Sequence, residues 1–516
     1  MMNGDYKELS DKIKEYFVDK KAEILKDIGS LVNIKSVRGE QTPCTPFGEG
    51  TAHALDKGLQ IAEKLGFSVK NGENYVGIAD FAADPDIDVH ELKAHLGILA
   101  HLDVVPEGSG WSSDPYECVV KDGKIFGRGT ADDKGPAVVS LYAVKAAYDI
   151  TGGLKKPVRV ILGTCEETGS EDLDYYNRNY KMPESVFSPD AEFPLINIEK
   201  GRLAVKFGAK TKPSCKKVFD ISPEIIWFCG GNTQNIVPHE ASCCIHFRSP
   251  DALELIKNIA DKTALYTNVK IEAEKVSGED YVYIITASGT GAHASTPEKG
   301  NNAQTALLCF LVSLYNKFRD ELCTENRCSE CQACDSENFF HYTKLLLQLF
   351  PHGDAAGTNI GIDFRDEKSG ELTLNFGVLN YKDNKLECGI DIRFPISEDM
   401  AADNYEELKK NVRLPLIRCG FEVISESFTL PHCTDENSDF VRILLDSYEA
   451  FTGNEKKCIA IGGGTYVHNI PGGVAFGCSM PGTDNRMHGA DEFAVIDDLI
   501  TSAEIFTLAI IKICNG

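Results

Sequence analysis

The segment "GILAHLDVVPEGSGW", from Gly97 to Trp111, begins as an apolar run that is typical of a buried β-strand. Two polar residues, His101 and Asp103, stand near the end of this run. Side chains two residues apart on a strand point to the same face, so these two are expected to share one side of a sheet. A buried imidazole and a buried carboxylate are costly unless a partner satisfies them. The segment therefore predicts a binding site at the end of a core strand.

The size and charge of the chain narrow the class of protein. Its 516 residues exceed what a single core usually supports, so two domains are expected. Hydrophobic residues make up 42% and charged residues 25%, which is the balance of a soluble globular protein. The formal net charge of −25 argues against nucleic acid as a partner, because the chain would repel a phosphate backbone.

The chain carries no visible targeting or membrane signal. The first residues, "MMNGDYKELSDKIKEYF", are charged from residue 5 onward and lack the apolar centre of a secretory signal. No uncharged apolar stretch of about 18 residues predicts a membrane span. Without a signal, the 18 cysteines are expected to be reduced thiols, which favours a cytoplasmic location.

Strand-like and helix-like segments alternate through the first 200 residues. Helices are expected over residues 9–30, over 51–65 and from Pro136 onward, and buried strands over 96–105 and in "PVRVILGTCEE". This alternation predicts an α/β fold with a mostly parallel central sheet flanked by helices. Sites in such sheets form beyond the carboxyl ends of the strands.

After about residue 200 the sequence pattern changes to alternating strand-like segments such as "ASCCIHF", "DYVYIITASG" and "KLECGIDIRFP". This change predicts an α+β domain at 200–430 that is inserted into the first domain, whose two parts are 1–199 and 431–516. The insert contains Cys323, Cys328, Cys331 and Cys334 within "CTENRCSECQAC". Four thiolates could hold zinc or an iron–sulfur cluster, but the spacing is compressed, and a loop of reduced thiols is the competing interpretation.

Six polar residues fall at strand ends or in the loops that follow them: His101, Asp132, Glu166, Glu167, Asp190 and His488. Imidazole nitrogens and carboxylate oxygens are ligands for zinc, manganese or cobalt. Two histidines with three carboxylates suit a pair of divalent ions bridged by one carboxylate, which can polarise a carbonyl and generate hydroxide. Asp103 is expected to accept the second N–H of the His101 ring.

The adjacent glutamates add a second function to this cluster. If Glu166 and Glu167 lie on an extended segment, their side chains point in opposite directions. One could then bind metal while the other acts as general base. Each of these patterns alone is more often a solvated or satisfied polar group, and only their collective placement favours a catalytic site.

Seven motifs in order along the chain resemble the M20 family of metallopeptidases, and within it the PepV-like dipeptidases, also described as Xaa-His or carnosinase-like dipeptidases. They are "HLDVVPEGSGW", "GRGTADDKGP", "EETGSEDL", "SPDAEFP", "GAHASTPEKGNNA", "DIRFP" and "RMHGADE". The resemblance implies a catalytic domain with two metal ions and an inserted lid domain.

The resemblance also assigns roles to individual residues. It implies His101 and Glu167 as terminal ligands on different metals, Asp132 as the bridge, and Asp190 and His488 as the remaining ligands. It makes Glu166 the general base and Asp103 the clamp on His101. In the lid, His293 matches an oxyanion-stabilising histidine, and Asn235 and Arg393 match residues that hold the substrate. The loop "GGGTY", with Gly463, Gly464 and Thr465, resembles a segment that closes around the substrate backbone.

These observations predict a dinuclear metallodipeptidase that acts on short peptides with a free amino terminus. Two divalent ions are expected, zinc first and manganese or cobalt as alternatives, in a monomer or homodimer that binds neither nucleic acid nor membrane. An N-acyl amino acid amidohydrolase is the nearest alternative, because the metal core cleaves the same bond in both. A catalytically dead metal-binding scaffold is the alternative of another class. The Cys323–Cys334 segment and His468 lie outside the family motifs.

Overall fold

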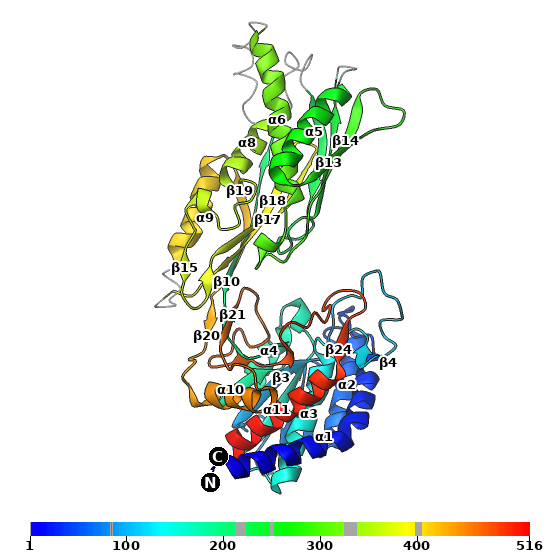
Figure 1. Ribbon diagram of the computed structural model, residues 1–516, viewed down its shortest axis with the longest axis vertical. Helices are drawn as coiled ribbons and strands as arrows, with labels where there is room; N and C mark the ends of the chain where they lie inside the picture. Colours follow the sequence, from blue (N-terminus) through cyan, green and yellow to red (C-terminus); the bar gives the residue numbers. More distant parts are fainter. Residues whose placement is uncertain are drawn as a thin grey trace. The chain divides into compact units, whose positions relative to one another are not determined.

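The computed structural model describes residues 2–82, 84, 86–211, 223–247, 252–324, 338–397 and 405–516 (Figure 1). The chain divides into two compact units, each with its own hydrophobic core. The first unit comprises Met1–Glu199, His432–Ala460 and Gly464–Gly516, and the second comprises Lys200–Pro431 and Ile461–Gly463. The cysteine segment at 323–334 lies outside the residues whose side chains are described.

The first unit is built on a mixed sheet, which within the described ranges has nine strands. The strand order is β1-β2-β6-β3-β7-β22-β9-β20, with β21 paired to β9. The centre, β6-β3-β7-β22, is parallel, whereas β1-β2-β6 and β22-β9-β20 are antiparallel. The α/β class expected from the sequence is confirmed, with parallel pairing confined to the middle of the sheet. The bounds are β1 Ser68–Gly72, β2 Val76–Phe81, β3 Leu96–His101, β6 Val158–Gly163, β7 Ser185–Ser188, β9 Ile196–Glu199, β20 His432–Cys433, β21 Ile459–Ile461 and β22 Val474–Ala475.

Three adjacent strands, β2, β6 and β3, are buried along their whole length because helices pack against the sheet. Every residue of β2, β3 and β6 is buried, which explains their nearly continuous apolar sequences. Helices α3 and α11 pack on this sheet and on each other, and α1 packs against both of them. The helices of this unit are α1 Met2–Val32, α2 Glu49–Lys64, α3 Lys134–Thr151, α4 Glu171–Asn179, α10 Asp439–Thr452 and α11 Ile496–Asn515.

Small pieces of sheet complete the first unit and frame the loops that follow the central strands. β24 pairs with β5 and β5 with β4, and β23 pairs with β8. Their bounds are β4 Val119–Lys121, β5 Lys124–Phe126, β8 Ala191–Glu192, β23 Cys478–Ser479 and β24 Phe493–Val495, and the 3₁₀ turn η1 covers Glu166–Thr168. β23 and β24 flank the loop that carries His488, so the two ladders together hold its two ends.

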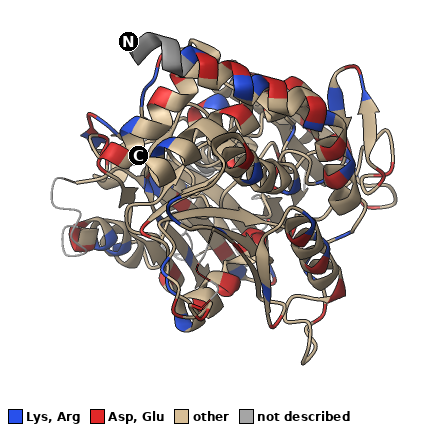
Figure 2. Cartoon of the chain, turned by 90° about the horizontal axis from the view of Figure 1, so that it is seen from below, with Lys and Arg blue, Asp and Glu red and all other residues tan. Residues whose placement is uncertain are grey.

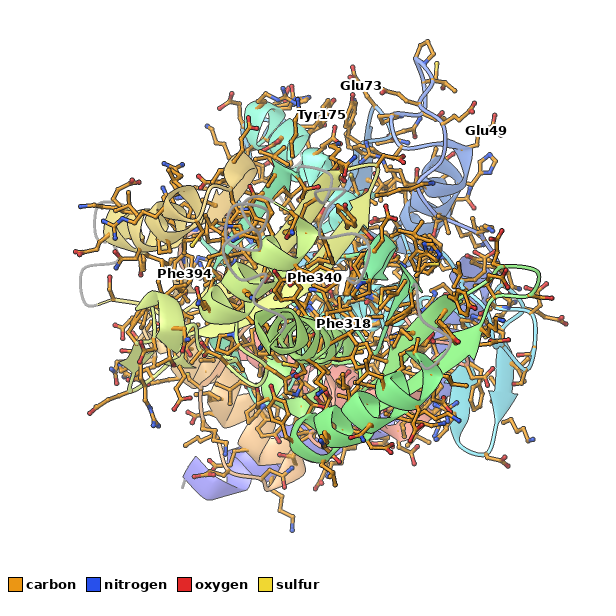
Figure 3. All side chains as sticks on the ribbon, turned by 90° about the horizontal axis from the view of Figure 1, so that it is seen from above. Glu49, Glu73, Tyr175, Phe318, Phe340 and Phe394 are labelled. Atoms are coloured by element: carbon orange, nitrogen blue, oxygen red, sulfur yellow. The ribbon has the colours of Figure 1, made fainter. Side chains whose placement is uncertain are left out.

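The second unit is an antiparallel sheet, with eight strands among the described residues, in the order β13-β14-β12-β11-β17-β18-β10-β19. Burial alternates along strands such as β11, as expected for a sheet with one packed face. Helices α5 and α6 pack on β13, β12 and β14, α8 packs on α6, and α9 packs on β19. Phe318, Phe340 and Phe394, labelled in Figure 3, belong to the core between these layers.

The elements of the second unit have the following bounds. Its strands are β10 Gly201–Lys210, β11 Glu224–Gly230, β12 Glu240–His246, β13 Lys270–Lys275, β14 Val282–Ser288, β15 Arg365–Asp366, β16 Gly370–Glu371, β17 Thr373–Lys382, β18 Lys385–Phe394 and β19 Glu422–Thr429. Its helices are α5 Ala252–Thr267, α6 Ala303–Thr324, α8 Phe339–Leu349 and α9 Glu406–Arg418, with 3₁₀ turns η2 at Pro297–Lys299 and η3 at Thr358–Ile360.

The surface charge is dispersed, although the chain is strongly acidic. Figure 2 shows Asp and Glu mixed with Lys and Arg along the helices on the face that it presents. On α1, for example, Lys12 pairs with Glu8 and Lys20 with Glu23. Among the described helices, none combines the length and the apolar composition that a bilayer crossing requires.

Candidate metal centre

The carboxyl ends of the parallel strands bring the predicted ligands together. His101 is the last residue of β3, Glu167 lies in the turn η1 after β6, and Asp190 follows β7 by two residues. Asp132 lies in the loop that leads into α3, two residues before the helix begins, and His488 lies in the loop before β24. All five belong to the first unit. Parallel neighbours end at the same edge of a sheet, which is why residues far apart in the sequence meet there.

These five side chains form two groups that could each hold a metal ion. His101, Asp132 and Asp190 make up one group, and Asp132, Glu167 and His488 make up the other. Within each group the ligand atoms lie within 4.8 Å of one another. Asp132 is common to both groups.

The two oxygens of Asp132 face different groups. Its Oδ1 lies 3.0 Å from His101 Nε2, and its Oδ2 lies 2.9 Å from His488 Nε2. Asp190 Oδ2 lies 3.4 Å from His101 Nε2, and Glu167 Oε2 lies 3.3 Å from His488 Nε2. A carboxylate placed in this way can bridge two cations.

Several of the ligand atoms are buried and unsatisfied. His101 Nε2, Asp132 Oδ1 and Glu167 Oε1 have no hydrogen-bond partner among the described residues. The first two are only 3.0 Å apart, yet they do not have the geometry of a hydrogen bond. Buried polar atoms left in this state are costly, and a divalent cation at the point they share would satisfy them. The donor set thus fits a metal site.

The titration behaviour of the cluster reflects its excess of carboxylates. Burial lowers the pKa of His101, but Asp103, Asp132 and Asp190 outweigh burial and raise it well above its ordinary value. Asp132 and Glu167 raise the pKa of His488 to about 11. Burial, together with the neighbouring Asp132, raises the pKa of Asp190 to about 6. The cluster therefore attracts positive charge, which is the property required of a cation site.

Glu166 stands beside the ligand groups without belonging to either. It precedes Glu167 in the turn η1, and burial raises the pKa of its carboxyl group well above the usual range. The segment is a 3₁₀ turn, so the expectation of two glutamates on an extended strand is wrong. A carboxyl group with a raised pKa next to a cation site is suited to accept and return a proton.

Two buried carboxylates produce this turn by binding four consecutive backbone N–H groups. Asp172 Oδ2 accepts from Thr164 N at 2.6 Å and Cys165 N at 2.8 Å. Asp103 accepts from Glu166 N and Glu167 N, both at 3.1 Å. These four hydrogen bonds hold the main chain of Glu166 and Glu167 in one conformation.

Asp103 differs in detail from the role expected for it. The nearer partner of His101 Nδ1 is the backbone carbonyl of Asp103, at 3.1 Å, whereas the Asp103 carboxylate lies 3.5 Å away. β3 ends at His101, so Asp103 has left the strand and its side chain turns toward the 166–167 turn. A carbonyl oxygen can only accept a hydrogen bond, so this contact favours a proton on His101 Nδ1.

Glu492 supports the bridging aspartate and had no role in the sequence interpretation. Its Oε1 accepts from Gly129 N and Ala131 N at 3.0 Å and from Asp132 N at 3.3 Å, and its Oε2 accepts from Arg128 Nη1 at 2.6 Å. Both members of the Arg128–Glu492 pair are buried. The residue lies within the quoted motif "RMHGADE", but binding to backbone N–H groups leaves no signature in a sequence.

The backbone of each histidine also has a distinctive environment or conformation. Asp133 Oδ2 accepts from the backbone N–H of His101 at 2.9 Å. His488 itself has a φ of 61°, in the left-handed region that non-glycine residues rarely adopt. Such a conformation costs about 1–3 kcal/mol and is concentrated at functional sites.

The predicted lid residues belong to the second unit. Asn235 and His293 lie on adjacent segments, because Ala294 N donates to Asn235 O at 2.8 Å and Ile236 forms a bridge with His293. Arg393 lies on β18, where its Nε donates to Asp391 Oδ1 at 2.6 Å and its Nη1 to Gly462 O at 3.1 Å. The structure thus gathers Asn235 with His293, and Arg393 with the start of the glycine loop.

The glycine loop is shared between the two units. Gly463 groups with the second unit, whereas Gly464 and Thr465 group with the first. The Thr465 hydroxyl donates to Glu199 Oε1 at 2.6 Å. Its proton is therefore engaged by the protein, and the part of Thr465 left for a substrate is its main chain.

Comparison with known proteins agrees with this geometry. Residues 97–512 match the family model "Peptidase family M20/M25/M40". The chain is 32% identical over 503 residues to "Putative dipeptidase YtjP" of Bacillus subtilis, covering 96% of this chain and 98% of that protein. It is also 32% identical over 506 residues to "Beta-Ala-Xaa dipeptidase" of Lactobacillus delbrueckii subsp. lactis, covering 97% and 98%.

Solved structures with the same fold include human carnosine dipeptidase 1, with a TM-score of 0.53, 15% identity and coverage of 98% of this chain and 99% of that one. The yeast dipeptidase Dug1p aligns with a TM-score of 0.52, 13% identity and coverage of 98% and 99%. The family match and the extended sequence identity lead to one conclusion: this chain belongs to peptidase family M20/M25/M40 and is a peptide-bond hydrolase.

Proposed function

We propose that this chain is a dinuclear metallodipeptidase that hydrolyses short peptides with a free amino terminus. The observation that carries the proposal is the pair of ligand groups that share Asp132, with buried donor atoms of His101, Asp132 and Glu167 left unsatisfied. His101 and Asp190 would hold one ion, Glu167 and His488 the other, and Asp132 would bridge them. The names of relatives that match this chain along nearly their whole length also state a dipeptidase activity.

In this proposal the chain's own residues move the protons and orient the substrate. The ions, when bound, would acidify a water molecule and polarise the scissile carbonyl. Glu166 accepts the proton from that water on its carboxylate and then donates it to the nitrogen of the leaving amine. His293 donates to the carbonyl oxygen as negative charge develops there. Asn235, Arg393 and the main chain of 463–465 bind the substrate, with Arg393 at its carboxylate.

We propose zinc as the native metal, because two imidazoles with carboxylate ligands form a set that zinc commonly uses. Manganese and cobalt accept the same ligands, so metal analysis of the protein purified without added metal decides between them. The cytoplasmic location and the monomeric or homodimeric state expected from the sequence belong to the same proposal. Fractionation and light scattering would test them.

The experiment that tests the reaction is a substrate panel. Metal-loaded protein would be assayed on free dipeptides, a tripeptide and N-acetyl amino acids, each with and without chelator. Chelator-sensitive cleavage of free dipeptides alone is the expected result. Cleavage of the acetylated compounds alone would instead indicate an N-acyl amino acid amidohydrolase. No turnover by protein that demonstrably holds metal would indicate a binding scaffold.

A further inference from the structure

The loop from Gly464 to His468 is held in place within the first unit by two buried carboxylates, Glu199 and Asp172, which have no part in the proposed reaction. Glu199, the last residue of β9, is 1% exposed. Its Oε1 accepts from the Thr465 hydroxyl and its Oε2 pairs with His468 Nδ1, both at 2.6 Å. Gly464 lies against this pair, since a Cβ there would be 3.4 Å from His468 Nδ1.

The second carboxylate holds the loop at Tyr466. Asp172 is fully buried, and its Oδ2 accepts from the Tyr466 hydroxyl at 2.6 Å. The same oxygen accepts from Thr164 N and Cys165 N, directly before Glu166. One atom thereby joins the glycine loop to the turn that carries the proposed base.

The surrounding sequence is adapted to this contact. Tyr466 is 2% exposed, and its ring meets the ring of His101 edge to face, with centroids 6.0 Å apart. Gly163, the last residue of β6, makes room for it, because a Cβ at this position would lie 1.8 Å from the Tyr466 hydroxyl. Only glycine at 163 permits the tyrosine to reach Asp172.

The energetics favour a fixed loop. A buried carboxylate is stable only while its hydrogen-bond donors remain in place. Displacement of the loop would remove two donors from Glu199 and one from Asp172, so its position is held by charge-assisted hydrogen bonds on two sides. Such support is what a segment needs if it is to present its main chain to a ligand in one geometry.

We propose that Glu199 and Asp172 are positioning residues that set the substrate-binding geometry of the glycine loop, Glu199 through Thr465 and His468 and Asp172 through Tyr466. This inference rests on the proposed function, because it assigns the main chain of 463–465 to the substrate. It gives His468, which no family motif includes, a specific role. It also makes Asp172 the link between substrate binding and the placement of Glu166.

The test removes donors and leaves both carboxylates in place. Tyr466→Phe deletes one hydroxyl, and Thr465→Val deletes another with little change in shape. Each is expected to raise KM about tenfold, as expected for one lost hydrogen bond to a charged group. kcat should change by no more than about twofold, because an interaction made equally in the ground and transition states affects KM alone. Bound metal should stay at the wild-type level.

Matched variants separate positioning from general destabilisation. Tyr142→Phe removes a similar buried hydrogen bond, 2.7 Å from the Tyr142 hydroxyl to Asp27 Oδ2, between α3 and α1. It should lower the melting temperature and leave KM unchanged. Thr465→Ser and His468→Asn keep a donor to Glu199 and should restore near wild-type KM, whereas Thr465→Val and His468→Leu should not.

The possible outcomes distinguish a failure of the positioning roles from a failure of the proposed dipeptidase function. An active wild type whose KM is unaffected by Tyr466→Phe and Thr465→Val would overturn the positioning roles and leave the dipeptidase proposal intact. An equal rise of KM in Tyr142→Phe and Tyr466→Phe would overturn them as well. A wild type with bound metal and no dipeptidase activity would instead contradict the proposed function.

Discussion

His101 and Asp132 in the first unit and His293 in the second unit are held in opposite ways. In the first unit His101 is fully buried and Asp132 is 7% exposed, and side-chain carboxylates bind the backbone around them. In the second unit His293 is exposed, and its Nδ1 lies 2.7 Å from Ser295 Oγ on the same loop, which pairs with Ile236. The difference indicates that His101 and Asp132 are preorganised by their surroundings, whereas His293 is presented at a surface. Substitution of His101 or Asp132 should therefore affect metal binding and stability, whereas substitution of His293 should affect turnover alone.

The largest effect is expected from Asp132→Asn. This change removes the carboxylate that both ligand groups share, so bound metal should fall from two ions to one or none. Loss of metal assistance is worth several kcal/mol, which corresponds to about a thousandfold or more in turnover. Metal analysis of the purified variant, together with its rate on a free dipeptide, provides the check. Two tightly bound ions in this variant would contradict the bridging role.

Glu166→Gln should separate chemistry from metal binding within the first unit. The variant keeps all five candidate ligands, so metal content should remain normal, while kcat falls about 10²–10⁴-fold with loss of the proton acceptor. The measurement is kcat at saturating substrate, with metal determined on the same sample. Near-normal turnover would remove Glu166 from the mechanism.

His293→Ala tests the other side of the comparison. Loss of an oxyanion donor should lower kcat about 10²–10³-fold. Because the side chain is exposed, the melting temperature and the bound metal should match the wild type. A drop in stability as large as that of a buried first-unit variant would show that the contrast of His293 with His101 and Asp132 is mistaken.

Glu492→Gln should weaken the metal centre without touching a ligand. The change loosens the backbone N–H groups of Gly129, Ala131 and Asp132 and leaves Arg128 buried without its counter-charge. Supporting residues of this kind typically change metal affinity about 10–100-fold. Competition with a chromophoric chelator measures that affinity, and an unchanged value would limit Glu492 to a structural ion pair.

The smallest effect is expected from Arg393→Lys. Lysine keeps the positive charge but loses the planar fork that can bind both oxygens of a carboxylate. KM for a free dipeptide should rise about tenfold, with kcat and metal content little changed. A dipeptide amide, which lacks the carboxylate, serves as the control substrate. If KM for both substrates rose equally, the carboxylate would not be the group that Arg393 binds.

Sequence reasoning captured the buried elements of the fold well. The apolar runs that became β3 and β6 predict buried strands directly, and the α/β class followed from their alternation with helices. The end of the sheet formed by β22, β9 and β20 was not predictable, because β20 and β22 each span two residues and show no periodic pattern. The antiparallel pairing of β9 with these two strands is set by tertiary contacts.

The candidate site was likewise predictable only in part. Residue types at strand ends were enough to nominate His101, Asp132 and Asp190, which the structure brings into one group. The turn at 166–167 was mispredicted, because its shape depends on four backbone N–H groups bound by Asp103 and Asp172. Hydrogen bonds from backbone to distant side chains have no spacing rule, so sequence reasoning could not anticipate them.

The most direct test of the central claim is a zinc titration of metal-free protein followed by its rate on a free dipeptide. The account predicts no activity without metal and a rate that rises to its maximum at two equivalents of zinc per chain. Glu166→Gln should take up the same two equivalents and remain inactive. Full activity in the metal-free protein, or a maximum at one equivalent, would contradict the dinuclear centre proposed around Asp132.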